Sequence, residues 1–234
     1  MSDRFFTPET LAPGEFLLAG PEAHHLASVR RFAPGDRITL FNGDGNEYSA
    51  EVLSTDRKRV LLNVLEVLPA SRELPFELTI AAAMPKGDRG DFLVEKLVEL
   101  GVSRFVPLLT ERTIVQPKDA RLEKLNHAVI EASKQCGRNV LMRIAELTKW
   151  TEFVRSATGW RAVLHPGPAN PRRDEFGGSS VIAVGPEGGF TEDEVNLAEA
   201  AGWTRLSLGP RILRIETAAI AAAARFSNPD AEAT

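Results

Sequence analysis

The stretch Val181–Thr191, with the sequence VIAVGPEGGFT, decides the fold that we expect for this chain. Its first four residues are apolar and mostly β-branched, which predicts a buried strand over 181–184. A glycine-proline pair ends that strand, and two further glycines permit backbone angles that other residues rarely adopt. Thr191, with Glu194 three residues later, predicts a capping box at a helix start. A strand, a glycine turn and a helix N-terminus in this order are typical of ligand sites in α/β proteins.

This turn differs from the familiar nucleotide-binding loops. It has neither the G-x-G-x-x-G pattern nor the GK[ST] ending of a P-loop. It is also acidic, because Glu187, Glu192, Asp193 and Glu194 surround the expected helix start. These charges would repel a polyphosphate, so a neutral or cationic ligand is favoured. On the turn alone, a tight turn that binds nothing explains the pattern equally well.

A second stretch, Leu206–Ala219, repeats the arrangement with the sequence LSLGPRILRIETAA. A short strand over 206–208 runs into Gly-Pro, and an alanine-rich helix is expected over 217–226. Another short strand, 162–165, ends at a histidine-proline pair. Because parallel strands end at the same edge of a sheet, we expect the three following loops to lie together.

These blocks resemble a known family. GPEGGFTEDE (185–194) followed by LGPRILRIETA (208–218) is similar to the SPOUT class of methyltransferases, and most closely to its RsmE type, the 16S rRNA (uracil-N3)-methyltransferases. Further blocks of that type occur in the same order: MPKGDRGDFLVEKLVELGV (84–102), TER (110–112), KQCGRN (134–139) and LHP (164–166). The family usually has an arginine after LHP, where this chain has Gly167. The resemblance covers nearly the whole chain.

Residues 1–73 are expected to form a small β-rich domain. Strand patterns occur over 38–43, 47–54 and 60–68, with the hairpin dipeptides Asn-Gly and Asp-Gly between the first two. Apolar residues near helical spacing predict one short helix over 21–31. The resemblance implies that this domain is a PUA-like β-barrel that binds RNA.

Residues 74–234 are expected to form an α/β domain, after a proline-containing linker over 69–77. Strands are predicted over 78–84 and 104–110, alternating with helices over 91–100 and 121–132. The resemblance implies a C-terminal SPOUT domain with a parallel sheet and a deep trefoil knot. The knot comes from the resemblance alone.

The resemblance also implies that the knot loops bind S-adenosylmethionine, largely through backbone groups. The acidic turn suits a cofactor that carries a sulfonium cation. The cofactor-binding residues expected are Leu164, His165, Pro166, Gly185, Pro186, Glu187, Gly188, Leu208, Gly209, Ile212, Leu213 and Thr217.

The implied acceptor is N3 of a uridine, conventionally numbered 1498, in the decoding region of 16S rRNA. Arg211 and Arg214 are the candidates to stabilise negative charge on the base. Glu187 or Glu216 could accept the N3 proton. For Glu216, a favourable charge at a helix N-terminus is the alternative.

The implied partners are the small ribosomal subunit and a second copy of the chain in a homodimer. Candidate RNA-binding residues are Arg4, Phe5, His24, Arg30, Arg31, Lys86, Arg89, Arg138 and Asn139. The charge argues against a uniformly basic surface, because the chain carries a net −4. A solvated helix end is the alternative for Arg30 and Arg31, and a helix cap at Asp88 is the alternative for the KGDR stretch (86–89).

The composition narrows the class of protein. The single cysteine, Cys136, allows no internal disulfide and fits a cytoplasmic location. Nitrogen methylation needs no cysteine nucleophile, so we interpret Cys136 as a packing residue. The four histidines show no metal-ligand spacing, and no apolar run is long enough to cross a membrane.

Other function classes stay open. One is a non-catalytic RNA-binding or ribosome-assembly factor, and another is a SPOUT enzyme that methylates a different RNA. A Rossmann-type methyltransferase is disfavoured, because LTIAAAMPKGD (78–88) lacks the glycine-rich turn that should follow its first strand.

Overall fold

The computed structural model describes residues 3–56, 58–115, 119–166 and 178–227, and Gly167 lies outside these ranges. Contacts between Cα atoms divide the chain into two compact units. The first contains Met1–Glu73 and Ile130–Leu141, and the second contains Leu74–Val129 and Met142–Thr234. Ile130–Leu141 thus belongs to the first unit although it follows the expected boundary at residue 73.

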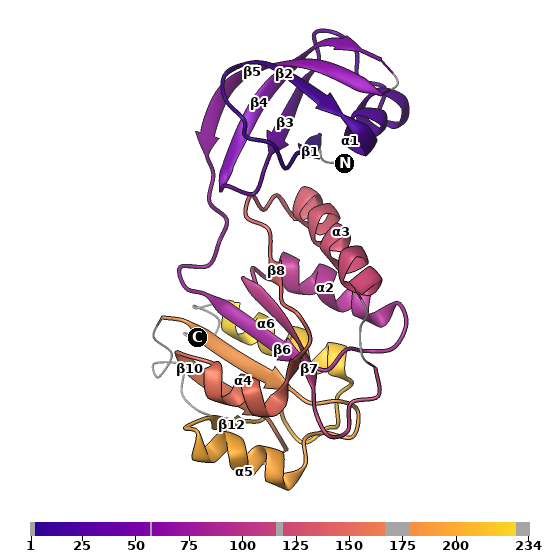
Figure 1. The fold of residues 1–234 in the computed structure, drawn as a ribbon. Coiled ribbons are helices and arrows are strands. Elements are labelled where there is room, and N and C mark those ends of the chain that lie inside the picture. The colour runs from indigo at the N-terminus through magenta and orange to yellow at the C-terminus, as the bar shows by residue number, and fades with distance from the viewer. Residues whose placement is uncertain (1–2, 57, 116–118, 167–177, 228–234) are drawn as a thin grey trace. The chain divides into compact units, whose positions relative to one another are not determined.

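The first unit is built on a five-stranded sheet with the order β1-β3-β4-β5-β2 (Figure 1). Its strands are β1 (Arg4–Phe6), β2 (Gly14–Ala19), β3 (Arg37–Phe41), β4 (Asn46–Thr55) and β5 (Arg59–Pro69). β1 runs parallel to β3, and the other neighbours are antiparallel. The predicted hairpin joins β3 to β4, with Gly43 and Gly45 at φ angles of 92° and 97°.

The expected helix over 21–31 is divided into two forms. α1 (Gly20–His24) continues into a π-helix, η1 (His25–Val29). Arg30 N–H donates to the His25 carbonyl at 2.9 Å, and Phe32 N–H donates to the Leu26 carbonyl at 3.2 Å. Between them Arg31 adopts φ 59°, a left-handed conformation that is uncommon outside glycine. Leu26 is fully buried in the core of this unit.

The second unit contains a sheet of parallel strands in the order β12-β10-β11-β6-β7-β8. These strands are β6 (Leu78–Ala82), β7 (Arg104–Leu109), β8 (Arg143–Ile144), β10 (Trp160–Leu164), β11 (Ser180–Val184) and β12 (Thr204–Leu206). A short strand, β9 (Thr148–Lys149), pairs with the end of β7.

Helices cover both faces of this sheet (Figure 1). α2 (Arg89–Glu99) and α6 (Ile215–Ser227) pack together on one face, and α4 (Trp150–Ser156) and α5 (Glu192–Ala200) pack on the other. Side chains of α4 and α5 share a core with alternate strand residues such as Ala183. The predicted α/β domain with a parallel sheet, preceded by a small β domain, is confirmed, and the trefoil knot stays a prediction.

α3 (Asp119–Cys136) contributes residues to both contact units. Gly137 ends it at φ 83°, donating its N–H to the Ser133 carbonyl. No helix among the described residues is both long and apolar enough to cross a bilayer.

Two local expectations need correction, and a third is confirmed. The strand expected over 206–208 is β12 at 204–206, because its pairing with β10 runs from Ala162–Thr204 to Leu164–Leu206. Asp88 stands at the N-cap of α2, but its side chain makes no capping hydrogen bond. The capping box of α5 is confirmed, with Thr191 Oγ1 accepting from Glu194 N–H and the Glu194 carboxylate accepting from Thr191 N–H.

Candidate active site

The loops that follow β10, β11 and β12 enclose a cavity of about 250 Å³. These strands are neighbours and parallel, so their carboxyl ends lie at one edge of the sheet. The cavity is lined by Leu164, His165, Pro166, Val184, Gly185, Pro186, Glu187, Gly188, Gly189, Leu206, Ser207, Leu208, Gly209, Arg211, Ile212, Leu213 and Ala218.

The glycine loop after β11 folds back on itself. Gly189 N–H donates to the Pro186 carbonyl at 2.8 Å, and Gly189 has φ 69°. A Cβ atom on Gly185 would lie 2.9 Å from the backbone nitrogen of Phe190. The shape of the turn therefore requires glycine at both positions.

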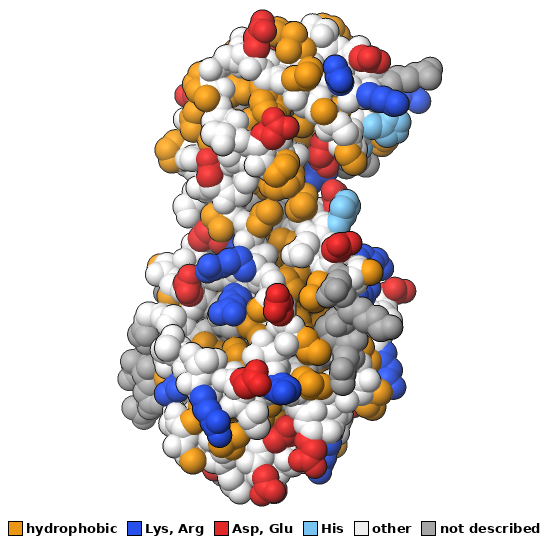
Figure 2. All heavy atoms as spheres, in the orientation of Figure 1, with side chains coloured by type: hydrophobic (Ala, Val, Ile, Leu, Met, Phe, Trp, Pro, Cys, Tyr) orange, Lys and Arg blue, Asp and Glu red, His pale blue; other side chains and the backbone are white. Residues whose placement is uncertain are grey.

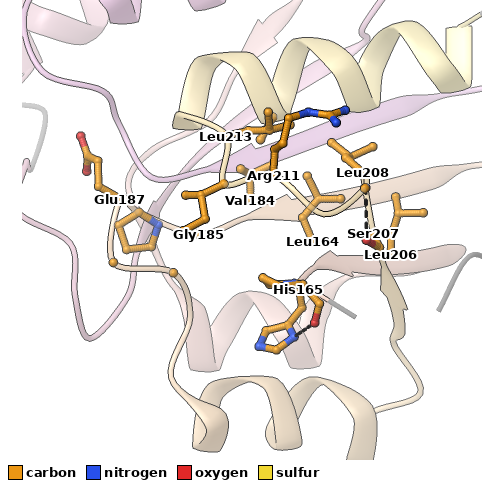
Figure 3. A pocket seen from close by; sticks show the side chains of 17 residues that line it. Leu164, His165, Val184, Gly185, Glu187, Leu206, Ser207, Leu208, Arg211 and Leu213 are labelled. Carbon is orange, nitrogen blue, oxygen red and sulfur yellow. Dashed lines mark hydrogen bonds between the residues drawn. The ribbon is translucent and has the colours of Figure 1, made fainter. Parts of the chain in front are cut away.

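Apolar side chains make up the centre of the cavity, and Glu187 lies apart from them at one side (Figure 3). Leu164, the last residue of β10, and Leu208 and Leu213, from the loop after β12, gather in the same region. His165 forms a contact of 2.8 Å between Nδ1 and the Pro166 carbonyl, and its Nε2 lies 3.6 Å from Glu192 Oε1. The site thus combines an apolar slot with acidic groups at its margin.

The structure brings together all the predicted cofactor-binding residues except Thr217. Thr217 is exposed and lies outside the lining, where α6 contributes Ala218 instead. The sequence interpretation missed Val184, Gly189, Leu206, Ser207 and Ala218. Each of them lies next to a predicted residue or within one of the sequence blocks given above. Their position in the same loops could therefore have predicted them.

Of the four predicted catalytic residues, Arg211 and Glu187 line the cavity. Arg214 is exposed and does not contribute to the lining. Glu216 is 7% exposed at the start of α6. Its Oε2 atom has no hydrogen-bond partner among the described residues.

Arg89, predicted to contact RNA, lies between two of these carboxylates. Its Nη2 is 3.8 Å from Glu187 Oε1, and its Nη1 is 3.5 Å from Glu216 Oε1. One guanidinium thus faces two carboxylates, which leaves a net negative charge on the group. Lys86, predicted alongside Arg89, is exposed.

In the first unit, three predicted RNA-contact residues are buried and a fourth, Arg4, is partly buried. Phe5, Arg138 and Asn139 are only 1%, 2% and 1% exposed. Arg138 holds the Glu73 carboxylate with two nitrogens, with Nε 3.1 Å from Oε1. Arg4 donates to Glu47 and Asn139. These side chains therefore stabilise the unit.

The other predicted residues of this unit lie at its surface. His24 and Arg31 are exposed. Arg30 is paired with Asp3 and stacks on Phe32, with its guanidinium carbon 5.7 Å from the ring centre. On the face shown in Figure 2, basic and acidic side chains are interspersed, in agreement with the net negative charge of the chain.

The Arg4 network affects the titration of Glu47. Burial alone would raise the pKa of this carboxyl, but hydrogen bonds from Arg72 and Arg4 and their charges outweigh burial. The pKa of Glu47 is therefore held below its ordinary value of 4.5.

Comparison with known proteins identifies the two parts of the chain. The RNA methyltransferase domain model matches residues 72–227, and the RNA methyltransferase PUA domain model matches residues 18–65. Ribosomal RNA small subunit methyltransferase E from Synechocystis sp. is 33% identical over 229 residues, covering 94% of this chain and 75% of the relative. The protein of the same name from Bacillus subtilis is 32% identical, covering 91% of this chain and 89% of the relative.

A solved structure agrees over the same length. The crystal structure of a ribosomal RNA small subunit methyltransferase E from Neisseria gonorrhoeae, bound to S-adenosyl methionine, has a TM-score of 0.90 and 32% sequence identity. The match covers 96% of both chains. The family predicted from the GPEGGFTEDE and LGPRILRIETA motifs is thereby confirmed, and this chain belongs to the ribosomal RNA small subunit methyltransferase E family.

Proposed function

We propose that this chain is a methyltransferase that transfers the methyl group of S-adenosylmethionine to N3 of a uridine in 16S rRNA of the small ribosomal subunit. One observation carries the proposal: the cavity formed by the three loops at the carboxyl edge of the sheet. A relative with 32% identity over nearly its whole length has been solved with this cofactor. An rRNA substrate also fits the cytoplasmic location that the single cysteine favours.

The residues of the cavity fit S-adenosylmethionine. Its apolar centre, with Leu164 and Leu213, suits an adenine ring, and the glycine-rich turns leave backbone groups close to a ligand. Glu187 supplies negative charge at the margin, which suits the sulfonium cation. When bound, the cofactor supplies an electrophilic methyl group.

The acceptor must lose a proton, since N3 of neutral uridine carries one. Arg211 lines the cavity, where its guanidinium can stabilise negative charge on the uracil oxygens. Glu187 and Glu216 are the candidate proton acceptors. Glu216 has a buried oxygen that no described residue satisfies, so it has capacity to accept a proton or a hydrogen bond. Arg214, in the loop before α6, would act only if that loop changed conformation on binding, and Thr217 would act only if the start of α6 also moved.

Recognition of RNA would involve exposed residues of both contact units. Of the predicted residues, His24 and Arg31 are exposed in the first unit, and Lys86 is exposed in the second. The chain would act as a homodimer, and sedimentation of the purified protein tests this. The target base must leave its stack to reach the cavity.

Methyl transfer to isolated small ribosomal subunits tests the proposal. Subunits from a bacterial strain that lacks its own enzyme of this type are incubated with labelled S-adenosylmethionine, and the digested 16S rRNA is analysed by mass spectrometry. We expect a single 3-methyluridine in the decoding region, conventionally at position 1498. Subunits from the parent strain, already methylated there, provide the control and should accept no label.

Other outcomes separate the alternatives. Cofactor binding without transfer to subunits or naked rRNA would retain the methyltransferase fold and reject this substrate, favouring another RNA. Absence of cofactor binding would reject the site and favour a non-catalytic RNA-binding or assembly factor.

A further inference from the structure

The TER block begins a tight turn, Thr110–Thr113, that follows β7 and has no part in the cavity lining. Thr110 N–H donates to Thr113 Oγ1 at 2.8 Å, and Thr113 N–H donates to the Thr110 carbonyl at 3.2 Å. The two threonine hydroxyls lie 2.9 Å apart. These bonds close the turn internally, so it can serve as a fixed support for groups beside it.

Arg112 extends from this turn to the glycine loop. Its Nη1 donates to the Gly188 carbonyl at 2.6 Å. The three atoms nearest to a Cβ atom built on Gly188 would all belong to Arg112, with Cδ the nearest at 3.1 Å. Gly188 has no positive φ angle, so its backbone conformation does not require glycine, but a Cβ here would press on the Arg112 side chain.

Both polar groups of one peptide are held in this way. The peptide between Gly188 and Gly189 offers a carbonyl, bound by Arg112, and an N–H, bound by the Pro186 carbonyl. A peptide between two glycines has little steric resistance to rotation. A hydrogen bond at each end therefore fixes its orientation at the wall of the cavity.

Glu111 attaches the same turn to the other end of the loop. Its N–H donates to Glu194 Oε1 at 2.8 Å, and Thr191 Oγ1 lies 3.4 Å from its carboxylate. Glu194 and Thr191 form the capping box of α5. The turn thus contacts the loop at Gly188 and again where α5 begins.

We propose that Thr110–Thr113 is a positioning element for the cofactor loop and that Arg112 is its principal positioning residue. This inference rests on the proposed function, because the ligand in question is S-adenosylmethionine. Arg112 fixes the Gly188–Gly189 peptide in the orientation that the cofactor requires, without touching the cofactor. Its removal lowers cofactor affinity because part of the binding energy must then order the loop.

Calorimetric titration with S-adenosylmethionine tests this on the full chain. We expect Arg112→Ala to raise Kd about tenfold, the loss of roughly one charge-assisted hydrogen bond. Arg112→Lys, which can still donate to the carbonyl, should recover part of the affinity. At saturating cofactor, kcat should stay within about twofold of the wild-type value, because only loop ordering has changed. Arg143→Ala, at an exposed ion pair with Glu77, is the matched control and should leave Kd unchanged.

A double-mutant cycle with Gly188→Ala gives a sharper test. In the wild-type background the added methyl would lie 3.1 Å from Arg112 Cδ, so it should shift the Arg112 side chain and weaken binding. In the Arg112→Ala background the close Cδ atom is gone and the Cβ of residue 112 stays at 3.6 Å, an ordinary contact distance, so Gly188→Ala should have little further effect. Additive losses in this cycle would overturn the inference.

The outcomes distinguish the inference from the proposed function. If wild-type protein binds the cofactor and Arg112→Ala binds equally well, the positioning role is rejected and the proposed function stands. If wild-type protein does not bind S-adenosylmethionine, the proposed function itself fails. A large fall in Tm for Arg112→Ala would indicate a general structural role and contradict the inference, since the Arg112 side chain is exposed.

Discussion

Arginines occupy two different environments in this molecule. At the carboxyl edge of the parallel sheet, Arg211 is exposed beside the cavity, and the described residues provide it with no ion pair. In the first unit, Arg4 and Arg138 are largely enclosed and bound to Glu47 and Glu73. An exposed guanidinium is available to a ligand, whereas an enclosed one has its charge neutralised within the fold. The first kind should affect activity when removed, and the second kind should affect stability.

The largest effect is expected at Arg138. Replacement by alanine leaves the Glu73 carboxylate without its bidentate partner, which should lower the free energy of unfolding by about 3 kcal/mol. Urea unfolding followed by circular dichroism measures this. If Arg138→Ala kept full stability and lost only RNA affinity, the division between the two environments would be wrong.

Arg211 should show the opposite behaviour. Arg211→Ala is expected to reduce kcat about a hundredfold, through loss of charge stabilisation on the uracil. Its Tm should match that of the wild-type protein, because the side chain is exposed. Single-turnover experiments measure the rate of the methyl-transfer step itself. An unchanged rate at saturating cofactor and RNA would remove Arg211 from the catalytic group.

Glu47 gives the enclosed network a pH dependence. Because its pKa is lowered in the folded state, it contributes stability above its unfolded pKa near 4.5 and loses that contribution as pH falls through the lower folded value. Glu47→Gln should cost about 1 to 2 kcal/mol at neutral pH and reduce the loss of stability below pH 4.5. Unfolding curves between pH 3 and 7 measure the stability at neutral pH and its loss at acid pH. If Glu47→Gln lost stability below pH 4.5 as steeply as the wild-type protein, the lowered pKa would not belong to Glu47.

The smallest effect on stability is expected at Arg31. It is exposed, so Arg31→Ala should change the free energy of unfolding by less than about 0.5 kcal/mol. If Arg31 contacts a phosphate, the salt dependence of RNA binding should fall by about one unit of slope. Filter binding at several salt concentrations measures this, and an unchanged slope would remove Arg31 from the RNA surface.

The loops of the sheet edge could be predicted because local sequence determines them. The apolar pattern of Val181–Val184 and the glycine-proline pair after it define where β11 ends. Because β10 runs parallel to β11, the carboxyl ends of the two strands lie side by side. Local sequence did not predict α4, a seven-residue helix whose Trp150 donates to the Glu194 carbonyl, 44 residues away. Such a short helix depends on tertiary contacts more than on its own sequence.

The partners of the arginines in the first unit could not be predicted from local sequence. Arg4 is bound to Glu47, 43 residues away, and Arg138 to Glu73, 65 residues away. No periodicity connects such positions. The sequence therefore does not distinguish an arginine that contacts RNA from one that pairs with a carboxylate of its own chain. The identity of the partner appears only with the tertiary structure.

The discontinuous first unit has a consequence for biosynthesis and for evolution. Its sheet is complete at Pro69, but Arg138 and Asn139 are made only after α3. A nascent chain must therefore extend beyond residue 139 before Glu73 and Arg4 acquire these partners. A gene fusion or duplication cut at residue 73 would transfer the sheet without them. The PUA-like part transferred alone would therefore lack the partners that Glu73 and Arg4 have in this chain.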